Sequence, residues 1–490
     1  MKTYCAVLVV VAAAILPPPV LGQKTEEAEK VVKLTLHPMA EPRPALKYQL
    51  LPPFLDRRPG NAAVAWNGIL AEQTPFFNEL YKEGGPWEKI DQWMKLPLGD
   101  PREKEFRAKE PVVAQTAVAL YRRMAYAARF ESCDWQLPFR EGNPLTIPLP
   151  EVQQSRTFGR LLSAKARLET AEGKYGRAVE TIQTGFALAR DVAKGQTLVN
   201  ALVGVAIASL MTPQIEQFIQ QPDAPNLYWA LATLPRPLVD FRPAFEVESS
   251  FLYLQFLDLT DLDKKDLVPE QWSRLLENTV KELSKLEETF AGRLGSEESK
   301  RSGLKLSAAA MAVQGYPVAK QYLVEHGRAA AEVEAMPVAK VILLYSVELY
   351  QGLSDEQYKL TFLPYAEGER WYAQADRMLK QAAAGRREII PLTLLLPLIS
   401  AAKHAETRME WTIARLRIFE ALRIYAAAHD GRLPDRLDDV GEVPIPRNPF
   451  DDKPFNYRRE GNRAVLTSEH GPRGLPWTYE ITMLPKGDKP

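Results

Sequence analysis

The sequence predicts a mainly α-helical protein, with a multi-helix body of α-hairpins, a long helix and a small C-terminal antiparallel β-sheet. From Asn61 to about Arg408, apolar residues recur at spacings of three or four, which is the period of an α-helix. Proline and glycine interrupt this pattern between the expected helices. Beyond Phe455 the apolar spacing changes to two, which is the period of a β-strand.

Residues 1–22 have the features of a secretory signal peptide. Lys2 gives a positive start, Val7 to Leu16 form an unbroken apolar run, and three prolines end it. The run is too short to span a bilayer, and the modest side chains at residues 20–22 place the mature N-terminus at Gln23. We therefore expect an exported protein, periplasmic or extracellular. The alternative is a retained N-terminal anchor.

The composition argues against two classes of partner. Lys plus Arg number 62 and Asp plus Glu number 62, so no electrostatic argument favours nucleic acid or an anionic membrane surface. The longest later apolar stretch, Ile389 to Ile399, contains Pro391 and Pro397, which predicts a buried helical segment and no membrane span in the mature chain. Cys133 is the single cysteine after residue 22, so no disulfide can form within the mature chain.

Residues 23–60 are charged at first and then rich in proline, which predicts an extended N-terminal arm. Residues 61–399 are predicted to form an all-helical body. Glycines and charges at residues 292–303 predict an internal loop that is sensitive to proteases. Helices are expected at residues 111–130, 196–220, 269–290, 337–350 and 366–384.

The stretch Leu161 to Ala189 resembles a tetratricopeptide helical hairpin, in which small and aromatic residues recur at fixed spacings. Gly173 is expected to end the first helix, Tyr175 to pack into the hairpin, and Ala178 and Gly185 to allow close helix approach. Stacked repeats need about three copies to bury a continuous core. One copy therefore predicts a local hairpin.

Residues 400–490 are predicted to form a long helix followed by a β module. A helix over residues 400–429 would be about 45 Å long at about 1.5 Å per residue. Its apolar stripe contains Met409, Ile413, Leu416, Phe419 and Leu422, while Arg408, Arg415, Arg417 and Arg423 lie off the stripe. Alternating residues around 455–457, 464–468 and 477–483 predict about three antiparallel strands.

Residues 416–466 resemble the part of type II secretion pseudopilins that follows their long helix, with a G-x-x-P-x-x-L turn, an N-P loop and a short sheet. Pseudopilins begin with a prepilin cleavage site and a membrane-spanning helix, whereas here the matching helix lies deep in an exported chain. The resemblance therefore implies a shared C-terminal module and no fibre-forming role. It rests on Gly431, Pro434, Leu437, Pro449, Pro454, Phe455 and Tyr457.

The chain from Tyr48 to Tyr457 is also similar to a family of uncharacterised exported helical proteins of planctomycete bacteria. This resemblance implies an envelope or extracellular setting and assigns no catalytic residue. It rests on the stretches YQLLP (48–52), PGNAA (59–63), CDW (133–135), VEAMPVAKVILLYS (333–346) and AHDGRLPDRL (428–437).

We predict no metal-binding residue, although three groups deserve comparison with known sites. His404, Glu406 and Glu410 come nearest to a transition-metal set, but residue 404 lies off the helix face that 406 and 410 share, so a solvated face is expected. His37, His326, His429 and His470 are scattered. Calcium binding stays an alternative for two acidic clusters, although carboxylates of turns and helix caps are the favoured interpretation. One cluster contains Asp258, Asp261, Asp263 and Asp266, and the other contains Asp438, Asp439, Asp451 and Asp452.

We also predict no catalytic or cofactor-binding residue. Cys133 is expected to be a buried structural thiol, and Glu246 and Glu248 are expected on different helix faces. The sequence has no phosphate-binding glycine loop and no G-x-S-x-G motif. Five tryptophans are expected in core packing, with a glycan groove as the alternative: Trp66, Trp87, Trp93, Trp135 and Trp229.

These observations favour a non-enzymatic, exported scaffold that holds a protein partner, without a cofactor. Two alternatives stay open at this point. One is a secreted hydrolase acting on polysaccharide or peptide, with active residues far apart in sequence. The other is an accessory component of a type II secretion-like system.

Overall fold

A computed structural model describes residues 30–100, 102, 118–141, 147, 149–294, 308–384, 388–396, 399–468 and 477–484, and it is mainly α-helical, as predicted. The predicted signal peptide lies outside these residues. The chain divides into two compact units, and the expected body of residues 61–399 contributes to both. Unit 1 contains Leu137–Pro148 and Arg242–Lys403, and unit 2 contains Gly22–Gln136, Leu149–Phe241 and His404–Pro490.

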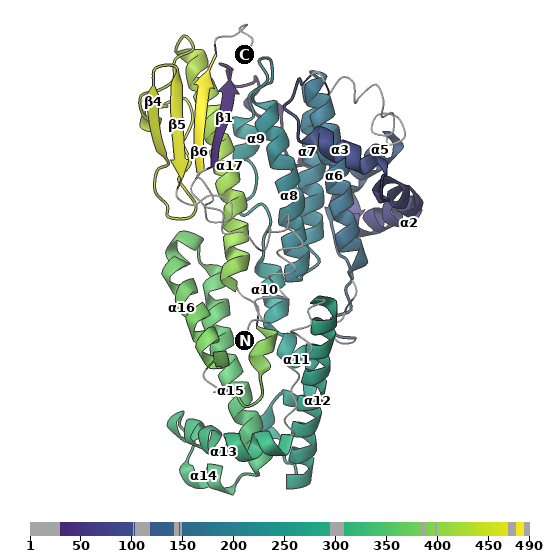
Figure 1. Cartoon of the computed structure of the whole chain (residues 1–490), viewed down its shortest axis with the longest axis vertical. Helices are drawn as coiled ribbons and strands as arrows, with labels where there is room; N and C mark the ends of the chain where they lie inside the picture. Colours follow the sequence, from purple (N-terminus) through teal and green to yellow (C-terminus); the bar gives the residue numbers. More distant parts are fainter. Residues whose placement is uncertain are drawn as a thin grey trace. The chain divides into compact units, whose positions relative to one another are not determined.

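Unit 2 contains a four-stranded sheet in the order β1-β6-β5-β4 (Figure 1). The strands β4 (Asn456–Glu460), β5 (Arg463–Ser468) and β6 (Trp477–Met483) are antiparallel, which confirms the predicted small sheet. Gly461 forms the β4–β5 turn with a φ of +67°. The arm predicted at residues 23–60 contributes an unexpected strand, β1 (Lys30–Leu36), which pairs in parallel with β6.

Three helices of unit 2 pack side by side: α6 (Pro150–Ala171), α7 (Tyr175–Ala193) and α8 (Leu198–Phe218) (Figure 1). Gly173 ends the α6 turn with a φ of +70°, as predicted. The ring of Tyr175 packs edge-on against Phe218 of α8, with centroids 5.3 Å apart. A Cβ on Gly185 would overlap the side chain of Met211 in α8. This glycine therefore permits the close approach of α7 to α8, and not to α6, its partner in the hairpin.

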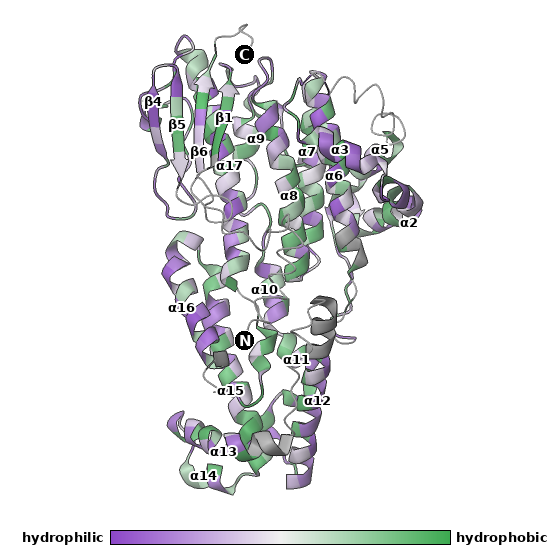
Figure 2. Cartoon of the chain, viewed as in Figure 1, coloured by the Kyte–Doolittle hydropathy of each residue, from purple (hydrophilic) through white to green (hydrophobic). Residues whose placement is uncertain are grey.

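Helix α8 is apolar along most of its length (Figure 2). In the described part of the chain, it is the one helix whose length and composition would suffice to cross a membrane. Of its qualifying 18-residue window, 72% is buried inside the protein. This burial is compatible with the expectation that the mature chain has no membrane span.

We expect Gly204→Ala in α8 to lower the free energy of unfolding by about 1–3 kcal/mol. An added Cβ would lie 2.6 Å from the Ala189 carbonyl oxygen, and backbone cannot move aside easily. Gly176→Ala in α7 is the matched control, because no atom lies within 4 Å of its added Cβ. The control should gain about 0.5–1 kcal/mol from helix propensity. Urea unfolding of both variants tests the difference, and equal effects would contradict it.

The remaining helices of unit 2 flank this packing. Asn61 caps α2 (Ala62–Tyr81) by accepting a hydrogen bond from the Ala63 amide at 3.0 Å. The helix predicted at residues 111–130 is present as α5 (Val118–Ala127), which ends earlier than predicted, and β3 (Phe130–Ser132) follows; residues 111–117 lie outside the described part. Strand β3 pairs in parallel with β2 (Arg58–Asn61). Two short helices complete the unit, α3 (Pro86–Met94) and α9 (Tyr228–Ala232).

The predicted long helix is present as α17 (Ile399–Ala428). Every residue from Ile413 to Ile424 is buried, so this part of the helix is enclosed on all its faces. Arg415, Arg417 and Arg423 lie off the apolar stripe and are nevertheless internal, which periodicity alone does not predict. Figure 2 shows hydrophilic stretches along α17.

In unit 1, α15 (Val338–Tyr358) packs against α12 (Pro269–Leu294), α13 (Ala308–Glu325) and α16 (Tyr365–Ala384). Two expectations need correction. The stretch from Ile389 is mostly buried, but it is not a continuous helix: Pro391 disfavours helical backbone at Ile390, and a 3-10 turn at Leu392–Leu395 follows; residues 397–398 lie outside the described part. The loop predicted from residue 292 is helical up to Leu294, and residues 295–303 are not described. Unit 1 also contains α10 (Arg242–Ser249), α11 (Phe251–Gln255) and α14 (Ala330–Ala335).

Candidate functional site

The histidines singled out in the sequence lie apart from one another. His326 and His429 each stack on a tyrosine one turn earlier, at centroid distances of 3.7 and 3.8 Å. The ring of His404 lies 5.0 Å from Phe450. Glu406 is buried and accepts a hydrogen bond from the Phe241 amide at 3.2 Å, so the solvated face expected there is wrong. Among described residues, which exclude His470, no group of three or more His, Cys, Asp or Glu is placed to hold a metal ion.

Members of the two acidic clusters act as ion-pair, cap and turn groups. Asp263 accepts hydrogen bonds from Arg328 at 2.8 and 3.0 Å, and this arginine holds the pKa of the carboxyl below its usual value. Asp439 accepts from the Arg436 amide at 2.8 Å and Asp451 from the Lys453 amide at 3.1 Å, as expected of cap and turn carboxylates. The clusters therefore do not converge on a shared centre.

Two further predictions from sequence concern burial. Glu246 is exposed and Glu248 is buried, which confirms that they occupy different faces of α10. Trp66, Trp93 and Trp135 are buried, which confirms core packing for three of the five tryptophans. Trp87 and Trp229 are half-buried, and each is in ring contact with a tyrosine, Tyr81 and Tyr228 respectively.

Three distant segments of unit 2 meet at Asp191, near the end of α7. The Trp66 indole donates to its Oδ2 at 3.1 Å, and Lys194 Nζ lies 3.4 Å from its Oδ1. The Trp135 indole and the Cys133 thiol both donate to its backbone oxygen, at 2.7 and 3.5 Å. Burial raises the pKa of Asp191 to about 6, against the opposing effects of Lys194 and Trp66.

Cys133 is buried as predicted, and burial raises the pKa of its thiol well above the ordinary value, with a further contribution from Asp191. A nucleophilic cysteine needs the opposite shift, toward the thiolate. The Cys133–Asp191 cluster is therefore a structural junction between α2, the segment after β3 and α7.

The second polar group of unit 2 lies on α17. Glu420 and Arg423 are both fully buried and form an ion pair at 2.8 Å. Glu420 also accepts from the Asn226 side chain and the Leu227 amide, each at 2.8 Å. Arg423 donates to the backbone oxygens of His37 and Ala224, at 3.0 and 2.6 Å. The pair thus ties the N-terminal segment and the segment before α9 to α17.

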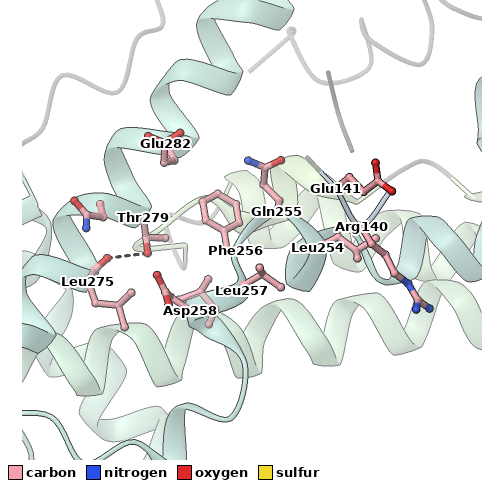
Figure 3. A pocket seen from close by; sticks show the side chains of 12 residues that line it. Arg140, Glu141, Leu254, Gln255, Phe256, Leu257, Asp258, Leu275, Thr279 and Glu282 are labelled. Atoms are coloured by element: carbon pink, nitrogen blue, oxygen red, sulfur yellow. Dashed lines mark hydrogen bonds between the residues drawn. The ribbon is translucent and has the colours of Figure 1, made fainter. Parts of the chain in front are cut away.

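A cavity of about 620 Å³ lies in unit 1 (Figure 3). This volume is in the range of ligand-binding pockets, which is about 300–1,000 Å³. Its walls come from the end of α11, the following turn, the face of α12 and residues 140–141. The apolar lining consists of Leu254, Phe256, Leu257, Leu259 and Leu275.

Local structure explains how these residues come to line one cavity. Helix α11 ends at Gln255, and a 3-10 turn at Leu257–Leu259 follows directly. The turn buries Phe256 and Leu259 and leaves Leu257 71% exposed at the cavity. On α12 the lining positions are 275, 278, 279 and 282, which share one helix face.

The polar lining consists of three neutral and four charged residues. Gln255, Asn278 and Thr279 are neutral, and the Thr279 hydroxyl donates to the Leu275 carbonyl at 2.9 Å. In Figure 3, Arg140 and Glu141 lie on one side, while Leu275, Thr279 and Glu282 lie on the other. The charged lining residues are Arg140, Glu141, Asp258 and Glu282.

Sequence reasoning singled out one residue of this cavity, Asp258, as a member of an acidic cluster. The other lining residues were missed because their convergence depends on how α11, its following turn and α12 fold together. The spacing i, i+3, i+4, i+7 on α12 was the one available signal, and every amphipathic helix shares it.

No protein-family model, curated protein or solved structure matches this chain. Its function is therefore inferred from the residues of the cavity and from the sequence.

Proposed function

We propose that this chain is an exported protein-interaction scaffold of the cell envelope, and that the cavity of unit 1 receives part of a partner protein. One observation carries the proposal: an apolar cavity of about 620 Å³ has a large, exposed leucine, Leu257, in its lining. A cavity of this size that is lined mostly by apolar side chains, with a few polar groups among them, is typical of a binding site.

Affinity capture from the native envelope fraction tests this proposal when it is paired with two variants. Leu257→Ser removes the exposed apolar side chain from the lining without adding charge, and it should strongly reduce recovery of a stoichiometric partner. Val313→Ser is the matched control, because Val313 is 79% exposed in the same unit and does not line the cavity. The control should retain the partner. Equal recovery of the partner by the wild type and by both variants would contradict docking at this cavity.

The proposed export predicts which residue begins the mature protein. N-terminal sequencing of the protein isolated from its native host should give Gln23 as the first residue, because the sequence predicts cleavage after Gly22. A protein that begins at Met1 and stays with the membrane would support the retained anchor instead. A protein that begins at Met1 in the cytoplasm would contradict export.

A secreted hydrolase is the second candidate, since three carboxylates line one cavity. Glycoside hydrolysis needs one carboxyl kept protonated by burial beside a second that stays ionised. Glu141 and Asp258 are exposed, and Glu282 is half-buried, which favours binding over acid–base chemistry. Turnover of a polysaccharide or peptide by the wild type that disappears in Asp258→Asn and Glu282→Gln would favour the hydrolase over the scaffold.

A role beside a type II secretion-like system is a third candidate. The order of a long helix, α17, followed by three antiparallel strands agrees with the pseudopilin resemblance. The additional parallel strand β1 departs from it, and it comes from the opposite end of the chain. Co-fractionation with the secretion machine would support this role.

A further inference from the structure

We propose that the cavity of unit 1 selects a positively charged peptide segment in which a bulky apolar side chain is followed or preceded by lysine or arginine. This inference rests on the proposed function, and it specifies the chemistry of the partner. It is argued from the apolar lining of the cavity and from the charges that surround that lining.

The apolar lining specifies the first half of the ligand. Leu254, Leu257 and Leu275 are exposed or half-buried, and they lie beside the buried ring of Phe256. A leucine, methionine or phenylalanine side chain placed against them would remove both its own and their apolar surface from water. A free polar metabolite would leave this surface without a partner.

The charges specify the second half. Three carboxylates, of Glu141, Asp258 and Glu282, line the cavity together with one guanidinium, that of Arg140. In Figure 3 the Arg140 guanidinium points away from the other labelled side chains. The charge beside the apolar lining is therefore negative, and it complements a cation.

The carboxylates differ in how far they are already neutralised. Glu282 forms an ion pair with Lys285, in which both side chains are about half exposed, and such pairs are weak. Neither Glu141 nor Asp258 forms an ion pair with any residue in the described part of the chain. A lysine or arginine of the partner would supply the cation that these two carboxylates lack.

Three matched peptides test the inference with the full-length protein. Each is acetylated and amidated, labelled with a fluorophore, and carries one central leucine flanked by lysines, by serines or by glutamates. Fluorescence anisotropy should show that the lysine peptide binds about tenfold more tightly than the serine peptide, which corresponds to about 1.4 kcal/mol. The glutamate peptide should bind most weakly, and the differences should shrink at high salt.

Two variants locate the effect. Glu141→Gln combined with Asp258→Asn should remove most of the advantage of the lysine peptide. Asp266→Asn is the control, since Asp266 is exposed in the same unit and does not line the cavity; it should preserve the advantage. Leu257→Ser should weaken binding of the serine peptide, whose leucine depends on the apolar lining.

The outcomes separate this inference from the proposed function. Equal binding of the three peptides, or preference for the glutamate peptide, overturns charge selection while docking at the cavity stands. An advantage of the lysine peptide that survives the double variant also overturns it. Failure of all three peptides to bind, together with equal partner recovery by wild type and Leu257→Ser, overturns both.

Discussion

Replacing Arg423 by alanine is expected to lower the free energy of unfolding of unit 2 by about 3–5 kcal/mol, the usual cost of breaking a buried ion pair. The change leaves the carboxylate of Glu420 charged and fully buried. It also removes the donors that satisfy the backbone oxygens of His37 and Ala224. Urea unfolding monitored by tryptophan fluorescence measures the loss.

Two comparisons identify the cause of this loss. Glu420→Gln in the Arg423→Ala background should recover part of the stability, because it removes the unpaired charge while the glutamine oxygen still accepts from Leu227. Arg458→Ala breaks an exposed pair with Glu460 in the same unit, with exposed fractions of 74% and 53%, and should cost less than about 1 kcal/mol. Losses of equal size at Arg423 and Arg458 would contradict the internal role of Arg423.

The second large effect concerns Asp191 and pH. Burial raises the pKa of this carboxyl from 3.8 to about 6, and one pKa unit corresponds to about 1.4 kcal/mol. The folded state binds the proton more tightly than the unfolded state, so the stabilisation is complete below about pH 4 and is lost as the pH rises through about 6. Between pH 7.5 and pH 4, the wild type should gain about 2.4 kcal/mol relative to Asp191→Asn.

Unfolding midpoints of the two proteins across this pH range provide the measurement. Glu420 has a pKa raised by burial too, so the difference between wild type and Asp191→Asn isolates the contribution of Asp191. Lys194→Met removes a cation that opposes the rise, and it should move the titration of Asp191 above pH 6. Parallel pH profiles for wild type and Asp191→Asn would show that Asp191 titrates as in the unfolded chain.

The Glu420–Arg423 pair and the junction at Asp191 also show which buried polar contacts a local sequence pattern cannot predict. An arginine off the apolar stripe of an amphipathic helix normally faces water, and the stripe of α17 gave no reason to expect otherwise. Arg423 is buried because the segments around His37 and Ala224 cover that side of the helix and supply acceptors to it. These segments lie hundreds of residues away, so their presence cannot be read from the helix itself.

Local sequence patterns predicted the mainly helical class, the hairpin that turns at Gly173, the extent of α8 and α17, and the three C-terminal strands. Each depends on periodicity or on a backbone preference that acts within a few residues. Tertiary structure alone decided the pairing of β1 with β6, the internal charges of α17, the junction at Asp191 and the cavity between α11 and α12. Each of these joins segments far apart in the chain, and the free energy that fixes them comes from burial and from hydrogen bonds formed only after those segments meet.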